Sequence, residues 1–155
     1  MRRKNYEKNV KPKNGARFRV GIVVSHFNAD ITDSMLAGAL ETLREWNVRA
    51  SRTHVIQVPG SFEIPYGCLT LLSHKQKPHA IITIGCIIKG ETKHDEYLAS
   101  AVSHGLMRLS LEHKTPISFG IITTNNLKQA RARSTGPMNK GREAAHAALE
   151  MALLK

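Results

Sequence analysis

The segment IITIGCIIKGETKHDEYLASAV, residues 81–102, contains side chains that could transfer protons and bind an anion. It passes from a β-branched apolar run through a glycine-containing turn into a helical pattern. His94 is suited to proton transfer near neutral pH because the unperturbed pKa of histidine is about 6.5. Glu91 and Thr92 precede the predicted helix, and free N–H groups at a helix N-terminus favour anions. A simple N-cap role for Thr92 explains that residue equally well.

Aromatic, amide and carboxylate side chains also follow the other apolar runs. Phe27 offers a flat ring that could stack on a heteroaromatic ligand, although it could also be a packing residue. Glu63 could accept hydrogen bonds from hydroxyl groups, or it could be an acid favoured by the dipole at a helix start. Asn28 could be a turn residue and Ser61 a helix cap. We predict that these loops line one small-molecule site.

The elements that must position these side chains alternate along the chain. We predict strands over 17–24, 53–58, 80–88 and 116–124, and helices over 31–46, 63–73, 94–113, 126–133 and 140–154. Alternating helices and apolar strands are typical of a parallel sheet covered on both faces. The predicted fold class is α/β, a single flavodoxin-like three-layer domain with a four-stranded parallel sheet flanked by helices. In such a sheet, ligands bind at the carboxyl ends of the strands.

The composition favours one domain with a basic surface. The 155 residues carry a formal net charge of +11, and seven of the 23 lysines and arginines lie in residues 1–17. The other basic residues are scattered and aromatic residues make up only 5% of the chain, so we expect no basic face and no nucleic-acid partner. Residues 1–16 are predicted to be a flexible basic segment. We expect no signal peptide, no membrane contact and a cytoplasmic location.

The cysteines and histidines form no metal-binding pattern. Cys68 and Cys86 are the only cysteines and lie 18 residues apart in apolar surroundings, which argues against a zinc site and a disulfide framework. Cys86 is interpreted as a small buried hydrophobic residue rather than a reactive thiol. Among eight histidines, only His94 adjoins a candidate anion site, so we expect no metal.

Five motifs together resemble one enzyme family. VVSHFN, VPGSFEIPYG, IKGETKH, FGIITTNN and NKGREAAHAALEMA occur in the order and spacing of the lumazine synthase (6,7-dimethyl-8-ribityllumazine synthase) family. The resemblance covers nearly all of a predicted lumazine synthase domain, residues 17–155. It implies a transferase that condenses 5-amino-6-ribitylamino-uracil with 3,4-dihydroxy-2-butanone 4-phosphate in riboflavin biosynthesis. It also implies that no metal or organic cofactor takes part.

The same resemblance implies roles for individual residues. His94 is the implied catalytic histidine, and Arg133 is implied to bind the substrate phosphate. The implied substrate-binding residues are Phe27, Asn28, Ser61, Phe62, Glu63, Cys86, Ile87, Ile88, Glu91, Thr92, Phe119, Arg133 and Lys140. In the family the last three come from the adjacent subunit, so we expect a homo-oligomer, either a pentamer or a larger assembly such as an icosahedral capsid. Without the resemblance, Phe119 would be interpreted as a core strand residue and Arg133 as a solvated helix end.

Three positions depart from the family pattern, namely His26, Lys89 and Asp95. Many members have arginine at the first two, and an aromatic residue usually follows the catalytic histidine. Asp95 adjoins His94 in a predicted helix, where consecutive side chains do not face each other, so it is not expected to orient His94. The alternative function is a non-catalytic lumazine- or riboflavin-binding shell protein, which would not need His94 and Arg133.

Overall fold

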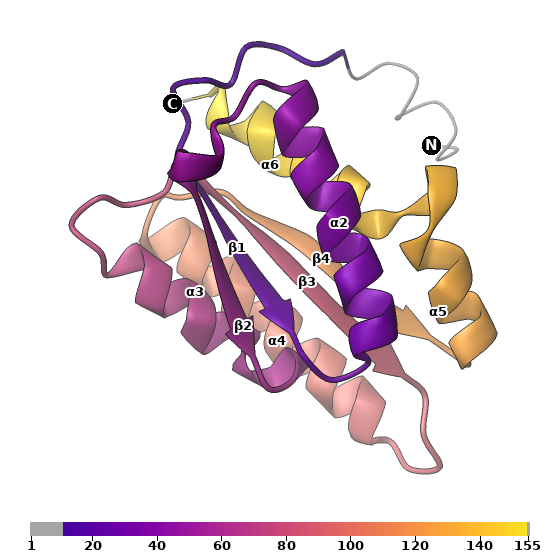
Figure 1. The fold of residues 1–155 in the computed structure, drawn as a ribbon. Coiled ribbons are helices and arrows are strands. Elements are labelled where there is room, and N and C mark those ends of the chain that lie inside the picture. Colours follow the sequence, from indigo (N-terminus) through magenta and orange to yellow (C-terminus); the bar gives the residue numbers. More distant parts are fainter. Residues whose placement is uncertain (1–10, 155) are drawn as a thin grey trace.

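Four parallel strands form the centre of the molecule, in a computed structural model that describes residues 11–154 (Figure 1). They are β1 (Val20–Ser25), β2 (Thr53–Val58), β3 (Ala80–Ile88) and β4 (Ile117–Thr124), in the order β2-β1-β3-β4. All neighbouring pairs are parallel, so the amino ends of the strands meet at one edge of the sheet and the carboxyl ends at the other. The predicted α/β class and the four-stranded parallel sheet are confirmed.

Helices cover both faces of this sheet, which confirms the predicted three-layer arrangement (Figure 1). One face carries α2 (Ala29–Glu45), α5 (Leu127–Ser134) and α6 (Lys140–Ala152). The other face carries α3 (Ile64–Leu72) and α4 (His94–Glu112). Short 3₁₀ helices occupy three of the connections, Ala50–Arg52, Ser61–Glu63 and Gly136–Met138.

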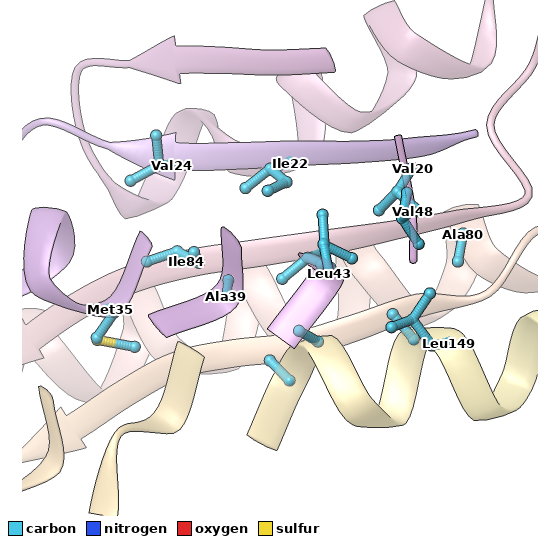
Figure 2. Close-up of a cluster of buried hydrophobic side chains, with 14 of the residues drawn as sticks. Val20, Ile22, Val24, Met35, Ala39, Leu43, Val48, Ala80, Ile84 and Leu149 are labelled. Atoms are coloured by element: carbon cyan, nitrogen blue, oxygen red, sulfur yellow. The ribbon is translucent and has the colours of Figure 1, made fainter. Parts of the chain in front are cut away.

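The sheet separates two apolar cores, because successive side chains of a strand point to opposite faces. On the α2 and α6 face, Ile22 and Ile84 pack with Met35, Leu43 and Leu149 (Figure 2). The second core, beneath α3 and α4, includes Val23, Ile64, Ile81, Leu106 and Ile121. Burial on both faces is why β1 and β3 appear in the sequence as almost unbroken apolar runs.

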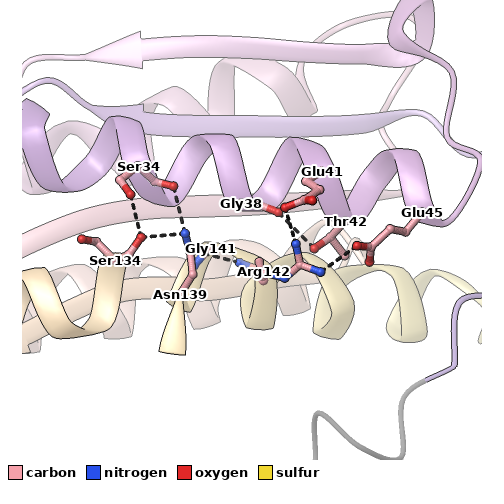
Figure 3. Close-up of polar contacts among 9 residues, drawn as sticks. All are labelled: Ser34, Gly38, Glu41, Thr42, Glu45, Ser134, Asn139, Gly141 and Arg142. Carbon is pink, nitrogen blue, oxygen red and sulfur yellow. Dashed lines mark hydrogen bonds and ion pairs between the residues drawn. The ribbon is translucent and has the colours of Figure 1, made fainter. Parts of the chain in front are cut away.

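Asn139 connects the loop before α6 to α2 and α5 (Figure 3). Its Oδ1 accepts hydrogen bonds from the N–H groups of Gly141 and Arg142 at 2.8 and 3.3 Å. Its Nδ2 donates to the carbonyl oxygens of Ser34 and Ser134 at 2.9 and 2.6 Å. The amide therefore caps α6 and fixes where the first turn of this helix lies.

The first turn of α6 lies directly against α2. Arg142 donates hydrogen bonds to Glu41 and Glu45, which stand on successive turns of α2 (Figure 3). A Cβ atom at Gly141 would overlap the carbonyl oxygen of Met35, so this close approach requires glycine. The short connection between α5 and α6 therefore has a defined position relative to the sheet.

The start of the domain differs in detail from the sequence prediction. Strand β1 begins at Val20 rather than at residue 17, and Phe18 before it is buried beside the His79 ring, outside the sheet ladder. Gly15 is buried and its N–H donates to the carbonyl of Trp46 at 2.6 Å. Of the predicted flexible segment, residues 1–16, the part over 1–10 lies outside the described residues.

Candidate functional site

A cavity of about 680 Å³ lies at the carboxyl ends of β1, β2 and β3, and we call it the strand-end cavity. The loops that follow these three strands and the first turns of α4 form its walls. It brings together most of the residues singled out in the sequence. Its lining consists of Phe27, Asn28, Gly60, Ser61, Phe62, Glu63, Cys86, Ile87, Ile88, Gly90, Thr92, His94, Asp95 and Leu98.

Backbone hydrogen bonds hold the loops after β1 and β2 together at the cavity. The N–H of Phe27 donates to the carbonyl of Pro59 at 2.9 Å, and the side chain of Phe27 stays 70% exposed. Asn28 has a left-handed backbone (φ 61°), and its Nδ2 donates to the carbonyl of Cys86 at 3.0 Å. Asn28 thus has the turn role considered above, whereas the Phe27 ring is not a core packing residue.

The loop after β2 directs Glu63 toward its own backbone and the cavity. Its Oε2 accepts a hydrogen bond from the N–H of Gly60 at 2.9 Å and so caps the start of the short 3₁₀ helix Ser61–Glu63. Within residues 11–154, its Oε1 has no hydrogen-bond partner. Ser61 is buried, and its Oγ lies only 2.7 Å from where a Cβ at Gly85 would be, so a glycine in β3 makes room for this loop. Because Oε1 of Glu63 has no partner among the described residues, this carboxylate can still accept a hydrogen bond from a hydroxyl group.

The turn before α4 differs from the sequence prediction in one respect. Helix α4 begins at His94, the predicted residue, but Glu91 and Thr92 lie in the bend before it, so their N–H groups do not belong to its first turn. The N–H of His94 donates to Thr92 Oγ1 at 3.4 Å, and Glu91 is exposed and does not line the cavity. A Cβ at Gly90 would meet no atom within 4 Å, so the chain's own packing does not require a glycine there.

Two further residues of α4 line the cavity beside His94. Leu98 follows one turn later, and residues four apart share a helix face, so periodicity was a usable signal for it. Asp95 has an Oδ1 that is buried and accepts no hydrogen bond from the described residues. The side chain of His94 is exposed at the cavity. The structure thus places an imidazole and an unpaired carboxylate oxygen in the same cavity wall.

The thiol of Cys86 is buried in the cavity floor. Burial, together with the negative charge of Asp30, raises the pKa of Cys86 to about 11. Burial alone raises the pKa of Cys68 to about 12. Both thiols are therefore protonated at neutral pH, in agreement with the interpretation of Cys86 as a small apolar residue rather than a nucleophile.

Three other predicted site residues, Phe119, Arg133 and Lys140, line a second hollow of about 350 Å³, which we call the β4 hollow. Phe119 lies on edge strand β4 and is 50% exposed, so it is not a core residue. Arg133, at the end of α5, donates to the carbonyl of Gln129 at 3.0 Å. Lys140, at the start of α6, forms an ion pair with Glu143 at 2.6 Å.

The two hollows of one chain have no lining residue in common. The strand-end cavity is lined by aromatic, polar and acidic side chains without a lysine or arginine, whereas the β4 hollow contains both Arg133 and Lys140. Within one chain the predicted site residues therefore lie in two places, and Phe119, Arg133 and Lys140 are the three that the resemblance assigns to the adjacent subunit.

Neither a metal cluster nor a spanning helix occurs in residues 11–154. No group of three or more histidine, cysteine, aspartate or glutamate side chains in this range could hold a metal ion. No helix in the same range is both long and apolar enough to cross a membrane.

An open parallel sheet with an amphipathic cavity at the carboxyl ends of its strands defines an α/β domain that binds small molecules. Residues 17–155 match the family model of 6,7-dimethyl-8-ribityllumazine synthase. The chain belongs to this family, and it is a transferase of riboflavin biosynthesis.

Curated relatives match over almost the whole chain. The 6,7-dimethyl-8-ribityllumazine synthase of Christiangramia forsetii is 41% identical over 151 residues, which cover 97% of this chain and 89% of the relative. The enzyme of the same description from Flavobacterium johnsoniae is 42% identical over 151 residues, 97% of this chain and 78% of the relative. That of Flavobacterium psychrophilum is 41% identical over 152 residues, 97% of this chain and 79% of the relative.

Proposed function

We propose that each active site of this synthase is shared, with the strand-end cavity of one subunit facing the β4 hollow of the next. The observation that carries this proposal is the division of charge. The butanone substrate carries a phosphate, and the strand-end cavity contains Asp95 and Glu63 but no lysine or arginine. A phosphate beside carboxylates needs a cation, and Arg133 and Lys140 line the other hollow.

The pyrimidine substrate then occupies the strand-end cavity. The exposed ring of Phe27 stacks on the heterocycle, and Phe119 of the adjacent subunit covers it from the other side. The free Oε1 of Glu63 accepts hydrogen bonds from the ribityl hydroxyls, while its Oε2 keeps the carboxylate in place through Gly60. The remaining contacts are those of Asn28, Ser61, Phe62, Cys86, Ile87 and Ile88, whose positions are set by the strand ends.

The butanone phosphate lies between Thr92 and the guanidinium of the neighbouring Arg133. The Thr92 hydroxyl and the free N–H groups in the first turn of α4 donate to the phosphate oxygens. Arg133 supplies the charge and a planar fork that fits two phosphate oxygens. Lys140 adds a second positive charge, partly neutralised by Glu143. Glu91 contributes at most through its backbone, since its side chain is exposed outside the cavity.

His94 moves the protons of the reaction. The amine of the pyrimidine attacks the ketone and water leaves to form an imine, phosphate is then eliminated, and ring closure releases a second water. Each step transfers a proton at a carbon, nitrogen or oxygen atom near neutral pH, which is the range of an imidazole. No metal or organic cofactor is needed for any of these steps. A shell protein that only binds lumazine would need neither this imidazole nor Arg133.

The shared site implies a closed ring of subunits, a pentamer or a larger assembly. We place this enzyme in the cytoplasm. Large apolar side chains on α4 are exposed in the single chain, with Tyr97 72%, Met107 63% and Leu111 69% accessible. Exposed apolar side chains grouped on one element are typical of surfaces that other subunits cover. Their presence supports an oligomer.

Complementation between two impaired variants tests the shared site. Phe27→Ala and Arg133→Ala chains, mixed before assembly, should together regain about a quarter of normal activity. In a ring of head-to-tail contacts about one interface in four then pairs two intact halves. A Phe27→Ala chain mixed with the double variant is the control and should regain nothing. Activity no higher than that of the separate variants would refute the shared site.

A further inference from the structure

A third hollow lies at the amino ends of β1 and β2, at the sheet edge opposite the strand-end cavity, and we call it the amino-end hollow. Its volume is about 450 Å³. No carboxylate lines it, whereas three cations and two histidines do. The lining residues are Arg19, Val20, Gly21, Ser51, Arg52, Thr53, His54, Leu71, His74, Lys75, Gln76 and Pro78.

The two arginines of this hollow are held by backbone groups rather than by acids. Arg19 Nε donates to the carbonyl of Lys77 at 3.2 Å, and Arg52 Nη1 donates to the carbonyl of Arg17 at 2.9 Å. None of the ion pairs in residues 11–154 involves Arg19, Arg52 or Lys75. The guanidinium groups of Arg19 and Arg52 are thus positioned and keep unused donors, and no described carboxylate pairs with the three cations.

Basic residues gather here although they are dispersed in the sequence. No aspartate or glutamate occurs in residues 8–29, 46–62 or 64–90, the segments that supply this end of the sheet. The same contacts bring the backbone of Arg17, Arg49 and Lys77 next to the hollow. The scatter of lysine and arginine was taken above to argue against a basic face. The scatter along the chain does not keep these residues apart in space, because the amino ends of parallel strands meet at one edge of the sheet.

Two imidazole rings stand at the rim of the same hollow. The ring centroids of His54 and His74 are 5.9 Å apart with an interplanar angle of 52°, and both side chains are exposed. Exposed histidine rings offer faces on which unstacked bases can lie. The bases of a duplex are already stacked on each other and do not reach such rings.

We propose that the amino-end hollow binds single-stranded nucleic acid through its phosphate backbone, independently of lumazine synthesis. Three cations line the hollow and three further basic residues adjoin it through their backbone, which together exceed what one phosphate group, with a charge of about −2, can neutralise. An extended anion therefore fits better than a small phosphorylated molecule. With few aromatic side chains, contact to phosphates dominates and binding is independent of sequence, with a Kd of about 10⁻⁴–10⁻⁶ M at physiological salt.

Salt-dependent binding of a labelled single-stranded RNA to the assembled enzyme tests this proposal by fluorescence anisotropy. The triple variant Arg19→Gln, Arg52→Gln, Lys75→Gln should bind more weakly. Its slope of log K against log salt should be smaller by about 2, since each neutralised phosphate contributes about 0.7 for single strands. The matched control, Arg44→Gln, Arg108→Gln, Lys128→Gln, removes the same charge elsewhere and should keep most of the slope.

Further arms separate the alternatives. Lumazine formation should be unchanged in both triple variants, which shows that they fold, and Lys75→Glu should weaken RNA binding without touching the arginines. Equal loss of slope in the two triple variants would mean that only net charge acts, and would overturn the proposal. The proposal would also be overturned if inorganic phosphate displaced RNA more than a salt of equal ionic strength does, or if duplex RNA bound as well as single-stranded RNA. A third contrary result is a triple variant of Arg19, Arg52 and Lys75 that loses binding to anionic lipid vesicles but keeps its RNA binding.

Discussion

Replacing Arg133 with alanine is the perturbation that isolates phosphate binding in the proposed site. Arg133 is half-buried in the β4 hollow, and its Nη1 is held by the carbonyl of Gln129. The Nε and Nη2 donors remain for a ligand, and the guanidinium is already positioned, so little side-chain entropy is lost on binding. This geometry allows a paired, charge-assisted contact to a phosphate.

The expected loss follows from the strength of such a contact. A hydrogen bond to a charged group contributes about 1.5–3 kcal/mol, so kcat/KM for the butanone phosphate should fall roughly 10- to 150-fold in Arg133→Ala. The KM for the pyrimidine substrate should change little, because Arg133 does not contact it in the proposed arrangement. Arg133→Lys should recover only part of the loss, since an ammonium keeps the charge but lacks the planar fork.

The assay is anaerobic steady-state formation of the fluorescent lumazine product, with each substrate varied in turn. Arg131→Ala is the matched control, because Arg131 is an exposed arginine of the same helix whose described ion pair is with Asp30 at 3.7 Å. Inorganic phosphate should compete with the butanone phosphate in the parent enzyme and much less in Arg133→Ala. Equal phosphate inhibition in the parent and Arg133→Ala, or equal losses in Arg131→Ala and Arg133→Ala, would refute the role of Arg133.

Three other predictions concern catalysis, packing and pH. His94→Ala should lower kcat by about 10²–10⁴-fold with pyrimidine binding retained, and an unchanged kcat would reject proton transfer by His94. Gly141→Ala should cost about 1–3 kcal/mol in urea unfolding, because its Cβ meets a backbone oxygen, whereas Gly105→Ala, with room beside Pro65, should cost nothing. The pKa of Cys86 is raised to about 11, so alkylation should be slow at neutral pH. Because the folded protein binds this proton more tightly, stability should fall as pH rises from about 9 toward 11, and flat stability there would contradict the burial argument.

The strand and helix pattern was predictable because it depends on local periodicity. The four strands and their parallel direction followed from apolar runs alternating with helical segments. The structure differs mainly by a few residues at the ends of these elements. Phe18 illustrates the limit: its apolar side chain looks like part of β1, but it is buried against His79 before the ladder begins. Burial and ladder pairing are separate properties, and only the first is visible in residue type.

The sequence by itself determined the α/β class, the loops that carry chemistry and, through five motifs, the enzyme family. What only the tertiary structure decided is which of these residues lie together. It placed Phe27, Glu63 and His94 in one cavity and Arg133 in another hollow of the same chain, and it left Glu91 outside both. It also gathered dispersed arginines at the amino ends of the strands. The physical reason is that residue type and spacing act along the chain, whereas distances between segments far apart depend on how the whole sheet and its helices pack.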